Sequence, residues 1–556
     1  MRRKLEKVTK SCKKTQDEVL LKRIGNCADT EYGKKFEFSK IKSREDFIAI
    51  HPLTRYSHYE PYIERMMKGE VNILIPPSSR LSVFAVTSGT SGKSNVLPMT
   101  SKQGFNFFLQ GISIVYDCIL RSFPDTVMLQ KDMKLFYTPK WRMSEAGIAI
   151  GPNSSSPSNS KSFLQLYTTP KAGYSVLSEP EALYIHLLFG LKDKYLGMIE
   201  ANFSSLVYSA FRALVQHHEQ LIEDIEKGCV NPSLDIEDEV RKELNELMTP
   251  DPVRADELKL AFKNGAIGLA KRAWPQCHLV VTADSGSFDL YARKLEASFC
   301  EGIPIYSPLY AASEGLLAIN IWPTQKPSQY LLVPTSMFFE FIPIQNCEEL
   351  QPKTLFLDQL EVDGIYEMVI SNASGLYRYR FGDVVRVAGF HNQCPYVEFL
   401  YRQGQFLNVR AEKTSESAFY EALQTAASNW PGIKILDYCC AESVMLDTLD
   451  DELVTDYAPF YHVFLELESN GETSTLTDEQ KSMIDETLCM QSYVYGSFRK
   501  KGSIRAMNVH IVKPGTFNDL RDFTIQTTTA SANQYKVPRV LKRKEAVDFV
   551  VKNVVC

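Results

Sequence analysis

The sequence predicts an α/β fold, built from a large N-terminal part and a smaller C-terminal part. Strand-like apolar runs and helix-like segments alternate through most of the chain, which is the pattern of α/β proteins. The length of 556 residues favours more than one domain. Hydrophobic residues make up 44% and charged residues 23% of the chain, so cores of ordinary size are expected.

Apolar periodicity locates the elements. Residues 1–30 and 206–227 show helical spacing, and the charged stretch 233–263 is prone to form helix. Four apolar runs, each closed by a turn signal, are predicted strands: 81–86, 278–283, 338–344 and 366–372. A domain break is expected after residue 400, where RQGQFLNVRAEKTSES precedes a new helix, and it defines domains 1–405 and 406–556.

Composition narrows the class of protein. The formal net charge of −5 gives no overall positive field for nucleic acid. No run of 18 apolar residues occurs, so no integral membrane segment is expected, and the first residues lack a secretory signal. The twelve cysteines have no CxxC spacing, which is typical of reduced thiols in a cytoplasmic protein. Nothing in the sequence indicates an oligomeric state.

A loop rich in glycine and hydroxyl groups follows the first predicted strand. Residues 87–100 read TSGTSGKSNVLPMT. Gly89 lets the backbone turn N–H groups toward an anion, and the nearby hydroxyls and Lys93 add donors and a charge. A plain surface turn is the simpler interpretation. A Walker A loop is excluded by spacing, because Thr87 stands where its first glycine belongs.

Two further segments carry chemistry. In YAASEG (310–315), Tyr310 offers a ring for a flat base, Ser313 a phosphate donor and Glu314 a magnesium ligand, although such a hexapeptide can be an ordinary turn. In YRYRFGDVV (377–385), Asp383 is expected on a tight turn between two strands, where it would accept ribose hydroxyls.

Three cationic residues are also candidates for binding a ligand. Arg378 and Arg380 alternate, so they face one side of an extended segment, as ligand-binding groups or as salt bridges. Near the C-terminus, Lys536 stands in NQYKVPR, where its neighbours restrict the backbone and would aim its side chain.

Taken in order, these motifs resemble those of the GH3 acyl acid amido synthetases, a branch of the adenylate-forming superfamily. TSGTSG, YAASEG and LYRYRFGDVV match the three family motifs, and the resemblance extends over almost the whole chain. The chain resembles an animal-type or otherwise divergent member more than a typical plant enzyme. The resemblance implies a large domain with a barrel-like sheet and α/β layers, and a small mobile C-terminal domain.

The resemblance also implies the chemistry. ATP and Mg²⁺ would activate a small carboxylic acid as an acyl-adenylate, and an amine, such as an amino acid, would then accept the acyl group. Matching by motif assigns Glu314, Lys413 and Lys536 as catalytic residues, with Glu314 also at the metal. The residues assigned to ATP binding are Ser88, Gly89, Thr90, Ser91, Lys93, Asn106, Tyr310, Ala311, Ser313, Gly315 and Asp383.

One departure from the family keeps a second function open. Asn95 stands three residues before Pro98, where family members commonly carry lysine. Lys93 would replace that charge, or the chain is a weak or inactive nucleotide- or acid-binding protein. An acyl-CoA ligase is the third candidate, because other adenylate-forming enzymes pass the acyl group to a thiol.

The acyl pocket would be built from residues 105–220. Most aromatic residues there, such as Phe105 and Trp141, are expected to pack in the core.

Overall fold

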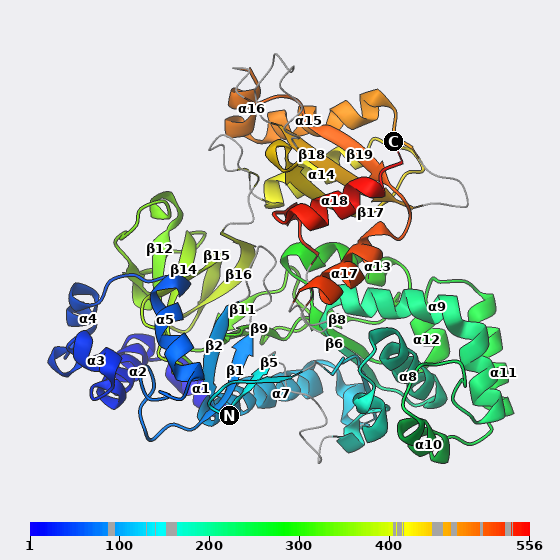
Figure 1. The fold of residues 1–556 in the computed structure, drawn as a ribbon, viewed down its shortest axis with the longest axis horizontal. Helices are drawn as coiled ribbons and strands as arrows, with labels where there is room; N and C mark the ends of the chain where they lie inside the picture. Colours follow the sequence, from blue (N-terminus) through cyan, green and yellow to red (C-terminus); the bar gives the residue numbers. More distant parts are fainter. Residues whose placement is uncertain are drawn as a thin grey trace. The chain divides into compact units, whose positions relative to one another are not determined.

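The computed structural model has a mixed α/β fold, as predicted (Figure 1). The chain forms two compact units that divide between Phe399 and Leu400. The finer domain limits, 1–405 and 406–556, stay a prediction. The structure describes residues 1–86, 95–128, 130–138, 141–151, 164–403, 407, 414, 416–446, 460–468, 475–500, 504–528, 535 and 537–555.

An eight-stranded sheet forms the centre of the first unit. Its strand order is β13-β12-β14-β15-β16-β11-β10-β9. The pairs β12–β13, β12–β14, β14–β15, β16–β11, β11–β10 and β10–β9 are antiparallel. The strands are β9 (Leu309–Ala312), β10 (Gly315–Ile319), β11 (Tyr330–Leu332), β12 (Phe338–Pro343), β13 (Leu355–Phe356), β14 (Ile365–Ser371), β15 (Tyr379–His391) and β16 (Cys394–Arg402). The predicted strands 338–344 and 366–372 are confirmed as β12 and β14.

The N-terminal helices pack on this sheet. The expected helix over residues 1–30 is divided into α1 (Arg2–Thr9) and α2 (Cys12–Cys27). Leu20 and Ile24 of α2 share one hydrophobic core with Phe338 and Phe339 of β12. The buried Gln16 amide donates to the carbonyls of Pro334 and Met337, so the helix is also tied to the backbone beside β12.

A four-stranded parallel sheet forms a second layer in this unit. Its order is β3-β6-β7-β8, from β3 (Asp132–Lys134), β6 (Met198–Phe203), β7 (Leu279–Ala283) and β8 (Ile305–Tyr306). A second hydrophobic core joins this sheet to its helices, which include α8 (Glu179–Lys192), α9 (Ser204–Lys227), α11 (Pro252–Lys263), α12 (Leu269–Ala273) and α13 (Asp289–Ala297). The expected helices over 206–227 and 233–263 are thus confirmed; the latter holds α10 (Asp238–Glu246) and α11.

A small sheet carries the strand before the glycine-rich loop. It has the order β2-β1-β5-β4, from β1 (Leu81–Val86), β2 (Val96–Thr100), β4 (Arg142–Met143) and β5 (Ala149–Gly151). α6 (Ser101–Phe107) follows β2 directly and begins with a capping box, in which Thr100 and Gln103 satisfy each other's backbone N–H groups.

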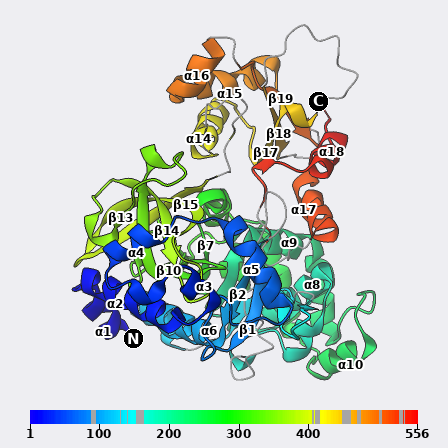
Figure 2. The same cartoon turned by 60° about the vertical axis from the view of Figure 1, so that its left-hand side comes forward.

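The second unit is built around its own sheet, of order β19-β18-β17-β20. These strands are β17 (Ile435–Glu442), β18 (Tyr461–Leu467), β19 (Asn508–Val512) and β20 (Val540–Leu541). α14 (Glu416–Ala427), α15 (Asp478–Gln491) and α16 (Tyr493–Lys500) contribute to one hydrophobic core, and α17 (Thr516–Thr527) and α18 (Lys544–Lys552) contribute to another. Figure 2 shows α14 and α18 on opposite sides of these strands.

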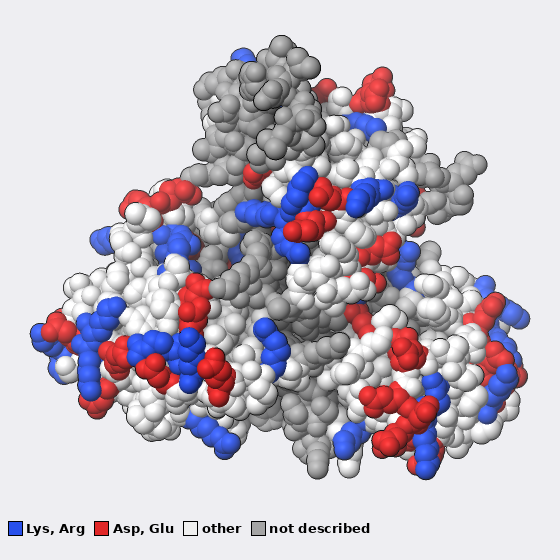
Figure 3. Space-filling view, viewed as in Figure 1, with Lys and Arg blue, Asp and Glu red and all other residues white. Residues whose placement is uncertain are grey.

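Charges are mixed on the surface of the described residues. On the face drawn in Figure 3, basic and acidic side chains lie interleaved, without a wide area of one sign. Among the described helices, none combines the length and the apolar character needed to cross a bilayer.

The connection between β14 and β15 depends on a glycine. Gly375 has φ +87°, and a Cβ atom there would lie 2.7 Å from both the Cβ and the carbonyl oxygen of Leu74. Both the backbone conformation and the space therefore require glycine at this position.

We expect Gly375→Ala to lower the free energy of unfolding by about 3 kcal/mol or more, because strain at positive φ adds to a clash with backbone. Urea denaturation followed by circular dichroism measures the change. Gly302→Ala is the matched control, because Gly302 has φ +78° but no atom within 4 Å of its would-be Cβ. Its cost should be about 1 kcal/mol. If the two variants lose the same free energy of unfolding, the clash with Leu74 does not contribute to the loss.

Candidate functional site

Residues of the second and third motifs meet inside the eight-stranded sheet. Tyr310 of β9 donates its hydroxyl proton to Oδ2 of Asp383 in β15, at 2.7 Å. Both residues are buried, with 8% and 2% of their surface exposed. β9 and β15 are four places apart in the strand order, which would separate them by roughly 19 Å in a flat sheet. The sheet must therefore curl strongly to bring the two motifs together.

The ring of Tyr310 lies among other aromatic rings. Its centroid is 5.9 Å from that of Tyr330 in β11 and 5.8 Å from that of Phe399 in β16. The Tyr330 hydroxyl in turn bonds Ser307 at 2.7 Å. Neighbouring rings and the hydroxyl bond to Asp383 thus fix Tyr310 at both ends.

The third motif does not have the geometry that the sequence suggested. We predicted Asp383 on a tight turn between two strands, and this is wrong, because Asp383 lies within β15. There the residues Phe381–Asp383 oppose Met368 alone, so β15 bulges, and Gly382 adopts φ +92°. Glycine before an acidic residue marks a bulge as well as a turn, and the sequence does not separate the two.

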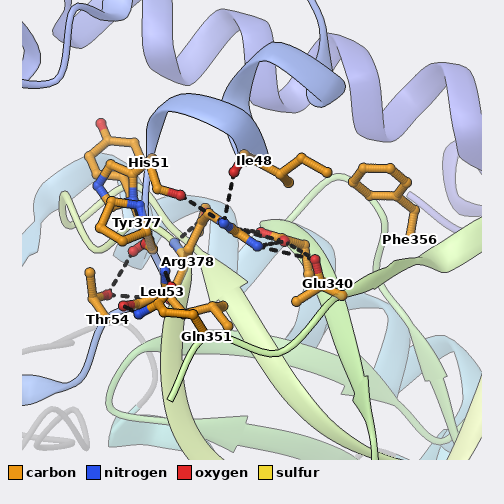
Figure 4. A network of polar contacts seen from close by, with 12 residues as sticks. Ile48, His51, Leu53, Thr54, Glu340, Gln351, Phe356, Tyr377 and Arg378 are labelled. Carbon is orange, nitrogen blue, oxygen red and sulfur yellow. Dashed lines mark hydrogen bonds and ion pairs between the residues drawn. The ribbon is translucent and has the colours of Figure 1, made fainter. Parts of the chain in front are cut away.

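The two arginines of this motif form buried ion pairs. Arg378 binds Glu340 of β12 at 2.9 Å and donates to the carbonyl of His51 (Figure 4). It also donates to the hydroxyl of Thr354. Arg380 binds Glu367 of β14 at 2.6 Å, and the carbonyls of Cys347 and Glu349. The salt-bridge interpretation of these arginines is therefore the one observed. They bind β15 and the residue before it to the neighbouring strands.

His51 belongs to the same network. Burial lowers its pKa to about 3, so its imidazole is neutral. Nδ1 donates to the carbonyl of Pro52, and Nε2 accepts from the Tyr32 hydroxyl, each at 2.8 Å. Because the ring is neutral, it places no positive charge beside Arg378, which donates to the backbone carbonyl of His51.

A residue that the sequence did not indicate links the second and third motifs. The amide of Asn372, directly after β14, donates to the carbonyl oxygen of Glu314 at 2.9 Å. Its Oδ1 accepts from the backbone N–H groups of Ser374 and Leu376. Asn372 thus fixes the turn after β14 and, at the same time, the backbone of Glu314. An asparagine at the end of a predicted strand signals a turn, but nothing local signals the bond to Glu314.

The other residues of the second motif lie around Glu314. Ala311 is in β9, Ser313 and Glu314 form the turn, and Gly315 starts β10 with φ +136°. Glu314 is buried, with 6% of its surface exposed. Among the described residues, no group of three or more His, Cys, Asp or Glu side chains is placed to hold a metal. A single carboxylate fits a Mg²⁺ ion that takes its other ligands from phosphate and water.

The structure says less about the remaining predicted site residues. Asn106 lies in α6, half-buried, and makes no hydrogen bond to Tyr310, Glu314 or Asp383 in the described part of the chain. The predicted site residues that lie outside the described residues are Ser88, Gly89, Thr90, Ser91, Lys93, Lys413 and Lys536.

Two of the aromatic residues after the first motif do not pack in the core as expected. Phe105 is 63% exposed and Trp141 39% exposed. Phe105 lies on α6 at a position that points away from the core, whereas Phe107 of the same helix packs against it.

The chain matches three family models that together cover most of its length. They are the GH3 family N-terminal domain over residues 1–305, the central domain over 330–402 and the C-terminal domain over 417–545. A solved structure of GH3.15 acyl acid amido synthetase is similar over 99% of this chain and 95% of its own, with a TM-score of 0.86 and 23% identity. That likeness concerns the fold.

Relatives are found in animals and in plants. A GH3 domain-containing protein of Mus musculus is 36% identical over 66% of this chain, and the match spans 65% of the mouse protein, slightly under two thirds of it. A GH3 domain-containing protein of Homo sapiens is 34% identical over 70% of this chain and 68% of its own. The 4-substituted benzoates-glutamate ligase GH3.12 of Arabidopsis thaliana is 28% identical over 99% of this chain and 96% of its own.

Three motifs in order, two of which meet in one curled sheet, and family models that cover the chain nearly from end to end lead to one assignment: this protein is a member of the GH3 family.

Proposed function

We propose that this protein uses ATP to activate a carboxylic acid as an acyl-adenylate and then transfers the acyl group to an amine, such as an amino acid. The observation that carries the proposal is the hydrogen bond from Tyr310 to Asp383, which unites the second and third motifs in a buried polar site. The plant relative of similar length is a benzoate–glutamate ligase, which supports ligase chemistry.

The reaction explains why such a site would hold a nucleotide. A carboxylate is a poor electrophile, because its leaving group would be an oxide. Attack of the carboxylate oxygen on the α-phosphorus of ATP forms a mixed anhydride and expels pyrophosphate. The amine then attacks the acyl carbon, loses a proton and expels AMP. Both steps balance without a covalent enzyme intermediate.

The residues of the second and third motifs have distinct roles in this proposal. Asp383 accepts the ribose hydroxyls, and Tyr310 orients that carboxylate by donating to Oδ2. Ala311, Ser313 and Gly315 line the nucleotide. Glu314, held by Asn372, would bind Mg²⁺, which neutralises charge on the phosphates when bound.

The remaining roles fall on residues outside the described part of the chain. Ser88, Gly89, Thr90 and Ser91 would donate to phosphate, and Lys93 would supply the charge that Asn95 lacks. Lys413 and Lys536 would be delivered by a mobile C-terminal domain. Transition states of phosphoryl transfer spread negative charge over oxygen atoms, so such donors and cations would supply most of the catalysis.

One observation favours a second candidate function. Asn95 replaces the lysine that is common in the family, so the chain would be a weak or inactive enzyme that retains the pocket. Pyrophosphate exchange across a library of carboxylic acids separates the two, because exchange requires an active adenylation site. Thioester formation with coenzyme A, tested in parallel, would instead identify an acyl-CoA ligase.

Asn95→Lys should raise the exchange rate if the missing charge limits adenylation.

We expect Asp383→Ala to abolish ATP binding and Tyr310→Phe to weaken it by about ten- to a hundredfold, because a hydrogen bond to a carboxylate is lost. Isothermal titration calorimetry measures the affinity. Tyr330→Phe is the matched control, since Tyr330 is a buried neighbouring ring whose hydroxyl bonds serines instead. If Tyr310→Phe binds ATP as well as the control does, Tyr310 does not orient Asp383.

We expect Asn372→Asp to reduce pyrophosphate exchange at least about tenfold and to raise the Mg²⁺ concentration that gives half-maximal exchange. The variant keeps the acceptor for Ser374 and Leu376 but sets a carboxylate oxygen against the Glu314 carbonyl. Ser374→Ala, in the same turn but without a bond to Glu314, should change neither quantity appreciably. An unchanged Mg²⁺ requirement in Asn372→Asp would contradict the positioning of Glu314.

We expect Lys536→Ala to impair one half-reaction far more than the other, with little change in nucleotide affinity. A domain that rotates over the site would deliver the lysine for one step and withdraw it for the next. Pyrophosphate exchange measures adenylation, and single-turnover reaction of preformed acyl-adenylate with amine measures transfer. Equal slowing of both steps, or of neither, would count against a delivered lysine.

A further inference from the structure

A cavity of about 560 Å³ lies at one edge of the parallel sheet of the first unit. Its lining comes from the residue before β3, from the segment 164–170, from the end of α8 and the residues after it, and from the start of α11. The cavity is open to solvent and has the size of a typical small-molecule site.

This cavity and the second motif lie at opposite edges of the sheet. Lys131 directly precedes β3, and Tyr195 lies three residues before β6. The four strands are parallel, so their amino ends share one edge, whereas Tyr310 follows the carboxyl end of β8. β6 has six residues and spans roughly 20 Å. A small ligand in the cavity would therefore not contact the second motif.

The acidic side chains of the lining are already engaged. Asp251 caps α11 by accepting from the Arg254 N–H, and Glu257 pairs with the Arg254 guanidinium at 3.1 Å. Asp193 accepts from the Tyr195 N–H. Since the lining has four cationic and three acidic side chains, its formal net charge is +1.

Lys131 and Lys192 carry the charge that is not compensated. In the described part of the chain, no carboxylate lies within 4 Å of either ammonium group. The Lys192 ammonium donates to the carbonyl of Leu247 at 2.5 Å. Burial lowers the pKa of Lys192; Asp251 opposes this shift and the charge of Lys131 adds to it. Two ammonium groups that repel each other in one cavity are stabilised by an anion.

A buried hydroxyl in the lining also lacks a partner. Thr168 is only 7% exposed, and within the described structure its Oγ1 has no hydrogen bond. Buried hydroxyl groups nearly always have such a bond, so this one is available to an oxygen atom of a ligand.

The rest of the cavity offers an apolar wall, made of Tyr195, Leu247 and Val253. Each of these side chains has half or more of its surface exposed, and the buried Phe189 also lines the cavity. An inorganic anion would leave this wall exposed to water, whereas an anion with an apolar body would cover it.

We propose that this cavity binds a monocarboxylic acid with an apolar body, at a second site separate from the nucleotide motifs. The carboxylate would bind Lys131, Lys192 and the Thr168 hydroxyl, and the body would cover the apolar wall. A single negative charge matches the net charge of the lining. Binding here requires no turnover, so it is measurable whether or not the protein forms adenylates.

Matched probes that differ in charge or in the apolar body test the proposal. Isothermal titration calorimetry compares 3-phenylpropionate with 3-phenylpropanol, which lacks the charge, and with acetate, which lacks the body. We expect 3-phenylpropionate to bind at least about tenfold more tightly than either. Equal binding of the acid and the alcohol overturns the site, and so does displacement of the acid by an equal concentration of inorganic phosphate.

Lysine labelling locates the bound acid. Reductive methylation of the full chain, read by peptide mass spectrometry, gives the reactivity of each lysine. With 3-phenylpropionate at ten times its dissociation constant, the rates at Lys131 and Lys192 should fall about tenfold. Lys227 pairs with Glu223 on α9, outside the cavity, and should react as before. Binding of the acid without protection of Lys131 and Lys192 places it elsewhere and overturns the proposal.

Variants test the two kinds of polar contact. We expect Lys131→Met to weaken binding of 3-phenylpropionate about tenfold and Thr168→Val about threefold, with little change for 3-phenylpropanol. Lys227→Met is the matched control and should bind the acid as the parent does. Lys131 is exposed, so its variant should fold. Unchanged affinity in Lys131→Met overturns the proposal even if Thr168→Val fails to fold.

Pyrophosphate exchange keeps this site distinct from the proposed function. Protection of Lys131 and Lys192 in a protein that shows no exchange would support the cavity site and contradict adenylation. Exchange without protection of either lysine would do the reverse.

Discussion

The curl of the eight-stranded sheet is the constraint on which the candidate site depends. Tyr310 and Asp383 are carried by strands four places apart, yet their side chains are joined by a hydrogen bond of 2.7 Å. A flat sheet would hold the motifs too far apart for one small molecule to contact both. The bulge at Gly382 contributes to this geometry, since bulges bend a strand and increase its twist. Sheet curvature and site chemistry are therefore set by the same few residues.

Buried ion pairs hold the third motif in place. Arg378 and Arg380 are satisfied by Glu340 and Glu367 and by backbone carbonyls, so neither charge is left uncompensated. Such pairs add little net stability, because removing two charges from water is costly. Their effect is to fix the register of the strands, because each arginine can reach its glutamate and its carbonyl acceptors in only one arrangement of those strands. They therefore maintain the position of β15 relative to β12 and β14.

The polar groups buried around the third motif have partners within the chain. Around Arg378 and Arg380 the donors and acceptors are matched, which makes that region rigid.

The sequence by itself determined what is local. Apolar runs located β1, β7, β12 and β14, and glycine and hydroxyl spacing singled out the three motifs. The family followed from those motifs because their residues are contiguous in the chain, and the family models confirmed it.

Tertiary structure decided every relation between distant residues. Whether Gly382 makes a turn or a bulge depends on the strand opposite it. That Glu340 and Glu367 pair with the arginines, and that Asn372 holds Glu314, depends on strands that meet only when the sheet closes. Contacts of this kind arise from burial and strand order, which a linear pattern does not encode.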